Sequence, residues 1–370
     1  MQNNYLHIIS FDNPFPPNYG GVIDVFFKIK ALHQIGCKVY LHCFTNQIPK
    51  ESAELDAITE KVYFYKSSSN PLLFLSRIPF SVISRNNRAL LQNLNAVKAP
   101  ILFEGMKTTL LVHKKKLEQS YKILRLHNIE QDYFAGIAKS ETAPLRKLMF
   151  YLESKKYSSF ENTIARFEKV ITLSDFENAY INQKFNNASY IPVFHGNEYV
   201  TQLEGKGEFA LYHGDLATPD NKEAVRFLIN VFKEIPDYKL VIASGSGQEF
   251  VTPLIAANKN IEFVEFSDFN DLKALLQKAH INISWSFQKS GTKLKLINAL
   301  FNSRFSIINE NIVDDKEISD LCILVTEKNQ LIAEINRLKQ LPFEDFLKRK
   351  SVLEHCLNDK NNALLIANSI

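Results

Sequence analysis

The chain has 370 residues, of which 45% are apolar, 23% charged and 12% aromatic, with a net charge of +4. This composition is typical of soluble folded proteins and excludes a disordered, collagen-like or disulfide-scaffold protein. At about 150 residues per domain the length corresponds to two or three domains, and we expect two.

No apolar run is long enough to cross a bilayer, which takes ~20 residues. The longest, such as residues 363–367, are far shorter. The start of the chain has no basic region, and Asp12 and Pro14 interrupt the apolar stretch after it, so we expect no secretory signal and a cytoplasmic protein. The four cysteines form no CxxC pair and are expected to be small buried hydrophobes, with neither disulfide nor zinc site.

The charge is unevenly divided along the chain. Residues 1–200 hold 24 Lys and Arg against 17 Asp and Glu, whereas residues 201–370 hold 20 against 23. Either the N-terminal half meets an anionic surface, or its lysines are scattered over a solvated face. Basic clusters interleaved with aromatic residues are absent, so no nucleic-acid partner is expected.

The N-terminal half alternates strand-like and helix-like patterns. A strand is expected at residues 6–11, followed by a loop rich in Pro and Gly at residues 12–21 and then by apolar residues at helical spacing as far as His33. The other strand-like runs of this half are residues 38–44, 61–65, 100–104, 122–126, 169–173 and 189–192. Near-continuous apolar strands separated by helices predict a parallel sheet covered on both faces.

A second alternating series follows a polar segment, residues 201–208, which we expect to be the linker. Its strand-like runs are residues 209–213, 239–243, 261–266, 281–286, 305–308 and 322–325, and its helical stretches include residues 222–235, 271–279 and 293–302. The expected domains are therefore residues 1–200 and 209–370, with the last helix packing either there or back on the N-terminal domain. Two doubly wound sheets bind ligands beyond the carboxyl ends of their strands.

Glycine is scarce, so its positions are informative. Gly20 and Gly21 end the first loop and open a helix, which suits a close approach to a phosphate or sugar but also a plain turn. Gly245 lies in a second strand-turn-helix segment, residues 244–248, that lacks the third glycine of a dinucleotide fingerprint. We interpret it as the wall of a pocket and not as an NAD site.

The segment 286–300 is the most informative one. The amides of Ser290, Gly291 and Thr292, two hydroxyls and the Lys293 ammonium converge on one helix N-terminus. Such a start combines unpaired N–H groups, the positive end of the helix dipole and a cation, which suits a diphosphate. The same residues are also ordinary helix-capping chemistry.

Three segments and the order of the elements along the chain carry a family resemblance. The segments are the opening residues 9–21, the strand end 124–130 and residues 291–295. Together they resemble bacterial GT-B glycosyltransferases, most closely the retaining group called group 1 or family four. The resemblance covers nearly the whole chain. It implies two Rossmann-like domains facing each other across a cleft.

The resemblance also implies a function and its residues. The reaction would transfer a sugar from a nucleotide-diphospho-sugar to an acceptor hydroxyl with retention, without a metal or cofactor, in bacterial surface polysaccharide or lipopolysaccharide synthesis. His127 and Lys293 are the expected catalytic residues, and Asn128 and Glu130 lie on the acceptor side. The donor and its phosphates would be bound by Gly20, Gly21, Lys222, Gly245, Ser290, Gly291, Thr292 and Asn298.

Two departures from the family pattern concern the donor site. Members often carry two glutamates with seven residues between them, and Ser290 and Asn298 stand in these positions. The family's basic residue after the first C-terminal strand falls near Asp215, which leaves Lys222, Lys293 and Lys295 as phosphate partners. Two alternatives therefore stay open: a non-catalytic GT-B protein that binds a glycan or partner enzyme, and a nucleotide-sugar epimerase that would use His213.

Residues 139–156 hold a basic stretch around the apolar block 148–152. One interpretation is peripheral contact with the inner face of the cell membrane, where a lipid-linked glycan acceptor would reside. The interpretation we favour is that the apolar block is the core face of a helix with solvated lysines.

Overall fold

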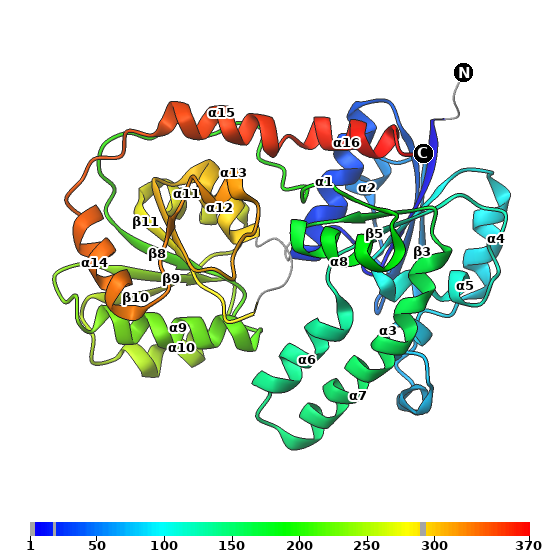
Figure 1. Ribbon diagram of the computed structural model, residues 1–370, viewed down its shortest axis with the longest axis horizontal. Helices are drawn as coiled ribbons and strands as arrows, with labels where there is room; N and C mark the ends of the chain where they lie inside the picture. The colour runs from blue at the N-terminus through cyan, green and yellow to red at the C-terminus, as the bar shows by residue number, and fades with distance from the viewer. Residues whose placement is uncertain (1–3, 18–19, 289–293) are drawn as a thin grey trace. The chain divides into compact units, whose positions relative to one another are not determined.

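The computed structural model describes residues 4–17, 20–288 and 294–370. Its contacts divide the chain into unit 1, Met1–Gly196 with Asp359–Ile370, and unit 2, Asn197–Asn358 (Figure 1). The change between the units thus follows Gly196, and the expected linker 201–208 lies inside unit 2. There the Thr201 amide donates to the Phe301 carbonyl at 2.8 Å and Gly205 bridges Phe343. The polar segment is therefore bound to its own unit through its backbone.

Unit 1 is built on a seven-stranded sheet in which every strand pair is parallel. The strands lie in the order β3-β2-β1-β4-β5-β6-β7, so the chain switches sides of the sheet between β1 and β4. They are β1 (Tyr5–Ser10), β2 (Lys38–Thr45), β3 (Lys61–Lys66), β4 (Ile101–Glu104), β5 (Lys122–Leu126), β6 (Lys169–Thr172) and β7 (Ala188–Tyr190). All seven lie within two residues of the bounds expected from the sequence.

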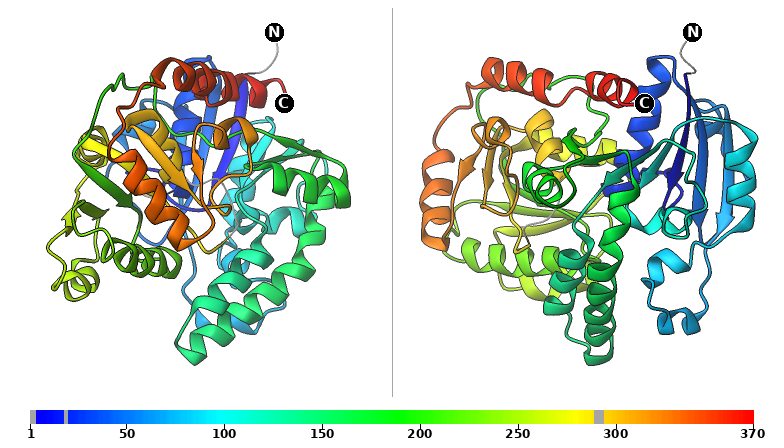
Figure 2. Two further views of the ribbon diagram at one scale, coloured as in Figure 1. Left: turned by 60° about the vertical axis from the view of Figure 1, so that its left-hand side comes forward. Right: turned by 45° about the vertical axis from the view of Figure 1, so that its right-hand side comes forward.

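The helices of unit 1 cover both faces of this sheet (Figures 1 and 2). They are α1 (Gly20–Gln34), α2 (Ala53–Asp56), η1 (Pro71–Leu75), α3 (Phe80–Ile83), α4 (Arg88–Ala96), η2 (Met106–Thr108), α5 (Leu110–His113), α6 (Glu130–Ser140), α7 (Pro144–Phe160), η3 (Glu161–Arg166), α8 (Asp175–Phe185) and α16 (Asp359–Ala367). Neighbouring strand residues face opposite sides, so Ile8 joins the core cluster under α1 and α16 whereas Ile9 joins the other one. The last helix thus packs on unit 1, where Ala363 and Ile366 are fully buried.

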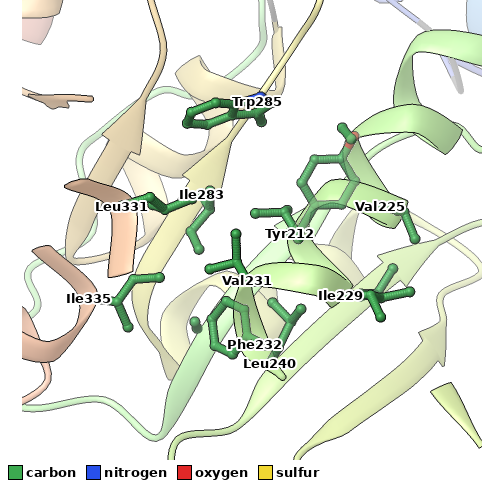
Figure 3. Packing of buried hydrophobic residues seen from close by; sticks show 14 of the residues in the cluster. Tyr212, Val225, Ile229, Val231, Phe232, Leu240, Ile283, Trp285, Leu331 and Ile335 are labelled. Carbon is green, nitrogen blue, oxygen red and sulfur yellow. The ribbon is translucent and has the colours of Figure 1, made fainter. Parts of the chain in front are cut away.

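Unit 2 repeats the architecture with six parallel strands in the order β10-β9-β8-β11-β12-β13. Its strands are β8 (Phe209–His213), β9 (Leu240–Ser244), β10 (Ile261–Glu265), β11 (Ala279–Ser284), β12 (Phe305–Ile308) and β13 (Ile323–Leu324). Its helices are α9 (Pro219–Phe232), α10 (Gln248–Ile255), α11 (Phe269–Lys278), α12 (Leu294–Asn302), α13 (Lys316–Ser319), α14 (Lys328–Leu338) and α15 (Phe346–Cys356). Figure 3 shows the larger core of this unit, in which α9 and α14 pack on the sheet around Tyr212, Ile283 and Trp285.

Helices α6 and α7 form a hairpin that extends away from the sheet of unit 1 (Figures 1 and 2). The favoured interpretation of the apolar block 148–152 as a core face is wrong for most of the block. Leu148, Tyr151 and Leu152 are 53%, 51% and 48% exposed, because α7 turns a different face, with Tyr157 and Phe160, toward the interior. Among the described residues, no helix is long and apolar enough to cross a membrane.

Candidate functional site

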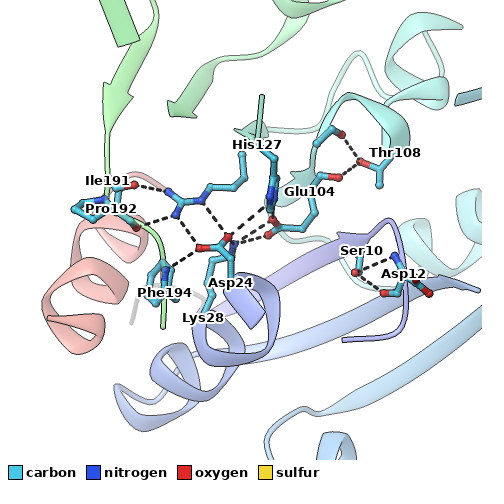
Figure 4. Close-up of polar contacts among 12 residues, drawn as sticks. Ser10, Asp12, Asp24, Lys28, Glu104, Thr108, His127, Ile191, Pro192 and Phe194 are labelled. Carbon is cyan, nitrogen blue, oxygen red and sulfur yellow. Dashed lines mark hydrogen bonds and ion pairs between the residues drawn. The ribbon is translucent and has the colours of Figure 1, made fainter. Parts of the chain in front are cut away.

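A buried cluster of ionisable side chains lies at the carboxyl ends of β4 and β5 in unit 1 (Figure 4). Asp24 and Lys28 come from α1, Glu104 ends β4, Arg125 lies in β5 and His127 follows β5. The first four side chains are at most 1% exposed, whereas His127 is 11% exposed. Two carboxylates and two cations balance, so the cluster is electrically neutral when His127 is neutral.

Asp24 is the centre of this network. Its Oδ2 lies 2.7 Å from Lys28 Nζ, and its Oδ1 accepts from Arg125 Nη2 at 3.0 Å and from the Phe194 amide at 2.8 Å. Burial raises the pKa of this carboxyl, but the charges of Arg125 and Lys28 outweigh burial and hold the pKa well below its usual range. Asp24 is therefore a permanent anion.

Glu104 binds Lys28 as well, together with the last member of the cluster, His127. Lys28 Nζ lies 2.9 Å from its Oε1, and His127 Nε2 lies 2.9 Å from its Oε2. Burial raises the pKa of Glu104, but Lys28 and the hydrogen bond to His127 more than offset it, and the pKa is below its ordinary value. Since an ionised carboxylate only accepts hydrogen bonds, the proton of neutral His127 lies on Nε2, which leaves Nδ1 as an acceptor.

The same residues offer metal-ligand atoms. In the described part of the chain, one oxygen each of Asp24 and Glu104 and a nitrogen of His127 lie within 4.8 Å of one another. However, the Lys28 ammonium already bridges both carboxylates at 2.7 and 2.9 Å. The donor set therefore suits an internal cation better than a bound metal.

The first loop of the chain meets His127 at this edge of the sheet. The ring of Phe11 packs edge-on against the His127 ring, with centroids 5.4 Å apart. A Cβ on Gly21 would lie 2.6 Å from Phe11 Cζ, so the close approach of α1 to Phe11 requires a glycine there. Gly20 is the exposed first residue of α1. The structure thus brings Gly21 and His127 together through Phe11.

The two residues expected on the acceptor side differ in exposure but line the same cavity. Asn128 is half-buried and Glu130 is 3% exposed, and both line a small cavity with Tyr157 and Ile181. Glu130 therefore points into the interior of unit 1.

In unit 2, the structure describes three of the expected donor residues, Lys222, Gly245 and Asn298. Lys222, in the first turns of α9, has its ammonium 5.3 Å from the centre of the Phe250 ring, and Phe250 belongs to the helix that follows Gly245. An added Cβ on Gly245 would have no atom closer than Phe266 O at 3.7 Å. The fold alone therefore does not require a glycine at position 245.

Asn298 lies on α12. It is 7% exposed, and its Oδ1 accepts from Asn197 Nδ2 at 3.1 Å. Asn302 donates to the Asn197 side chain at 2.8 Å as well, so this asparagine cluster fastens the start of unit 2. Ser290, Gly291, Thr292 and Lys293 lie outside the described residues.

Two further residues of unit 2 have structural partners. The Lys295 ammonium donates to the Trp285 carbonyl at 2.9 Å and to Asn221 Oδ1 at 3.2 Å. His213, which the epimerase alternative would use, is fully buried. Burial, and to a lesser extent the positive charge of nearby Lys295, lowers the pKa of His213 to about 3. It is a neutral imidazole at neutral pH.

Comparisons with known proteins agree with this architecture. The solved structures that match include sucrose-phosphate synthase from Thermosynechococcus elongatus, at TM-score 0.68 and 15% identity over 99% of this chain and 98% of that one. Anabaena HepE in complex with UDP and glucose matches at TM-score 0.66 and 12% identity, over 98% of both chains. An α,α-trehalose-phosphate synthase (UDP-forming) from Burkholderia xenovorans matches at TM-score 0.64 and 9% identity, over 99% of both chains. Two doubly wound parallel sheets thus align with these proteins end to end.

The chain has the GT-B fold. No protein-family model matches it. A protein of unknown function encoded in the cps region of Klebsiella pneumoniae is 25% identical over 319 residues, which is 81% of each chain.

The GT-B fold brings together four residues that sequence reasoning missed: Asp24, Lys28, Glu104 and Arg125. Two signals were present. A lone arginine interrupts the otherwise apolar strand 123–126, and Asp24 and Lys28 are four residues apart on one helix face. Charges in strand and helix positions that are otherwise apolar indicate buried pairing, although the partners cannot be identified from spacing alone.

Proposed function

We propose that this GT-B protein is a glycosyltransferase that moves a sugar from a nucleotide-diphospho-sugar to an acceptor hydroxyl. The observation that carries the proposal is the alignment of both doubly wound units, over nearly the whole chain, with sugar-phosphate synthases and a UDP complex. The Klebsiella cps-region relative supports a place in bacterial surface polysaccharide or lipopolysaccharide synthesis. We assign to the chain an acceptor that is a glycan or lipid-linked glycan, and a location at the inner face of the cell membrane.

The residue roles form part of this proposal. His127 presents Nδ1 as an acceptor for a sugar hydroxyl, with its ring orientation set by Glu104. In unit 2, Lys222, the Gly245 turn and residues 290–293 bind the diphosphate, whose negative charge grows as the sugar leaves. The transfer proceeds with retention and needs neither metal nor cofactor.

The first experiment is a thermal-shift panel of UDP, GDP, ADP and CMP and their sugars, with and without magnesium. A ligand at 100 times its Kd stabilises the folded state by about 2.7 kcal/mol, which corresponds to several degrees. We expect one nucleoside diphosphate to raise Tm equally with EDTA and with magnesium. Lys222→Ala should weaken this shift, whereas Lys233→Ala, an exposed lysine just after α9, should not.

Turnover with the responding donor then tests transfer itself. His127→Ala should lower turnover, and the exposed His33→Ala on α1 serves as its control. NMR of the product gives the anomeric configuration and so tests retention. If no nucleotide stabilises the protein, the transferase proposal is wrong.

A second candidate is a non-catalytic GT-B protein that binds a glycan or partner enzyme. One observation favours it: Asn298, in place of a family glutamate, is buried and hydrogen-bonded to Asn197. This candidate predicts that donor binding, where it occurs, is followed by neither transfer nor hydrolysis of the sugar.

A further inference from the structure

Helix α7 has two faces of opposite character. Side chains of Glu153, Tyr157 and Phe160 are buried against unit 1. On the other side, Leu145, Leu148 and Leu152 recur at the i, i+3, i+7 spacing of one helix face and are 71%, 53% and 48% exposed, and Tyr151 beside them is 51% exposed. A row of large exposed apolar side chains on a projecting helix is unusual for a solvated surface.

A second segment extends this apolar face. In η1, Leu72 and Leu75 are 68% and 84% exposed, and residues three apart in a 3₁₀ helix lie on the same side. Lys156 of α7 joins the two segments, since its Nζ donates to the Phe74 carbonyl at 2.8 Å. Both segments project from the same side of unit 1 in the two views of Figure 2. We call the six exposed large apolar residues of α7 and η1 the hairpin surface: Leu72, Leu75, Leu145, Leu148, Tyr151 and Leu152.

Positive charge predominates in residues 139–156, which hold most of the hairpin surface. Residues 139–156 hold five basic and two acidic side chains. Both acidic ones are paired within the stretch, Glu141 with Arg146 at 3.2 Å and Glu153 with Lys156 at 2.8 Å. Lys147 and Lys155 are exposed, and Lys155 Nζ lies 5.4 Å from the centre of the Tyr151 ring, next to the apolar row. The net charge of the stretch is thus +3, and Lys155 lies beside the apolar row.

We propose that the hairpin surface docks on a membrane that contains anionic lipid. Leucines with an interfacial tyrosine would enter the boundary between headgroups and acyl chains, while Lys147 and Lys155 would meet lipid phosphates. The exposed face is too short and too polar to span a bilayer, so the contact is peripheral. The proposed function enters only in the purpose of the docking, which is to hold unit 1 at a lipid-linked acceptor.

Co-sedimentation with vesicles tests the docking. The probes are vesicles of pure phosphatidylcholine and vesicles in which one-third of the lipid is phosphatidylglycerol. We expect the protein to sediment with the anionic vesicles at low salt and to be released at about 1 M salt, where the Debye length is ~3 Å. At about 1 kcal/mol per cation near an anionic surface, the Lys147→Gln/Lys155→Gln variant should bind about 30-fold more weakly.

Variants and controls separate the outcomes. Leu145→Ser/Leu148→Ser/Leu152→Ser should abolish sedimentation, whereas Leu347→Ser, a 77% exposed leucine on α15, should not change it. Lack of binding by the wild-type protein at low salt, or unchanged binding of the triple variant, would overturn the proposal. So would a triple variant that changes only the oligomeric state, since the surface would then be a protein interface. Thermal shifts with nucleotides, measured without vesicles, report separately on the proposed function.

Discussion

Removal of the Arg125 guanidinium should strongly destabilise unit 1. The side chain is completely buried, and it donates to Asp24 at 3.0 Å and to the carbonyls of Ile191 and Pro192 at 2.7 and 2.8 Å. Arg125→Met keeps much of the volume but leaves Asp24 with half of its positive partners and two carbonyls without their donor. Breaking a buried ion pair by removing one partner costs about 3–5 kcal/mol. We expect a loss in that range.

The assay is unfolding in urea, followed by far-UV circular dichroism and by tryptophan fluorescence. Trp285 is the single tryptophan and is buried in unit 2, so its fluorescence reports that unit, whereas circular dichroism reports both. The control is Arg146→Met, because Arg146 is 67% exposed and its pair with Glu141 should contribute less than about 1 kcal/mol. Asp24→Asn added to Arg125→Met removes the stranded charge and should restore part of the loss. If Arg125→Met unfolds within about 1 kcal/mol of Arg146→Met, the ion network does not stabilise the unit in this way.

Three further predictions concern other groups. Burial, with His7 nearby, lowers the pKa of His42 from 6.5 to about 3, so between these values the unfolded state binds a proton that the native state does not. The contribution of neutral His42 to the free energy of unfolding should therefore be full above pH 6.5. Below that pH it should fall by about 1.4 kcal/mol per pH unit. Urea titrations at several pH values measure this slope, and His42→Gln should remove it. Glu104→Gln should move the proton of His127 to Nδ1, which ¹⁵N NMR detects as a change of tautomer. The rate of sugar transfer should fall by about 10–100-fold, because His127 loses the residue that orients it. An unchanged tautomer would contradict the role assigned to Glu104. Gly245→Ala should change the free energy of unfolding by less than about 0.5 kcal/mol but weaken nucleotide binding. Gly247→Ala, at a position with φ +102°, should lower the free energy of unfolding by about 1–2 kcal/mol. Equal losses of stability in both variants would show that position 245 serves the fold.

The strands could be predicted from the sequence because their signal is local. Runs such as residues 122–126 and 209–213 are apolar almost throughout, and this pattern is what burial between two layers of helices demands. The interpretation of residues 148–152 as a core face was wrong because a local pattern carries limited information. The pattern along α7 shows that one face is apolar, but not which face the rest of unit 1 covers. Only the packing of Tyr157 and Phe160 decides that Leu148 faces solvent.

The cluster around Asp24 required information that spacing does not contain. Its partners come from α1, β4, β5 and the segment after β7, up to 170 positions apart in the chain. A charged residue in a buried position predicts that an opposite charge lies near it. Which residue supplies that charge depends on how the topology of the sheet brings distant segments together. His127 was found because a family resemblance pointed to it, and its supporting residues were not.

Exposure within the cluster separates support from contact. Four of its five side chains are at most 1% exposed and satisfy one another, so they cannot reach a ligand without the unit opening. His127 alone is partly exposed, and its Nε2 is held by Glu104, which leaves one nitrogen and one orientation for anything outside. Changes at Arg125 should consequently alter stability first, and changes at His127 should alter ligand handling first. A histidine with only a structural role would show the reverse, since its removal would take one of two partners from Glu104 and lower stability without changing binding.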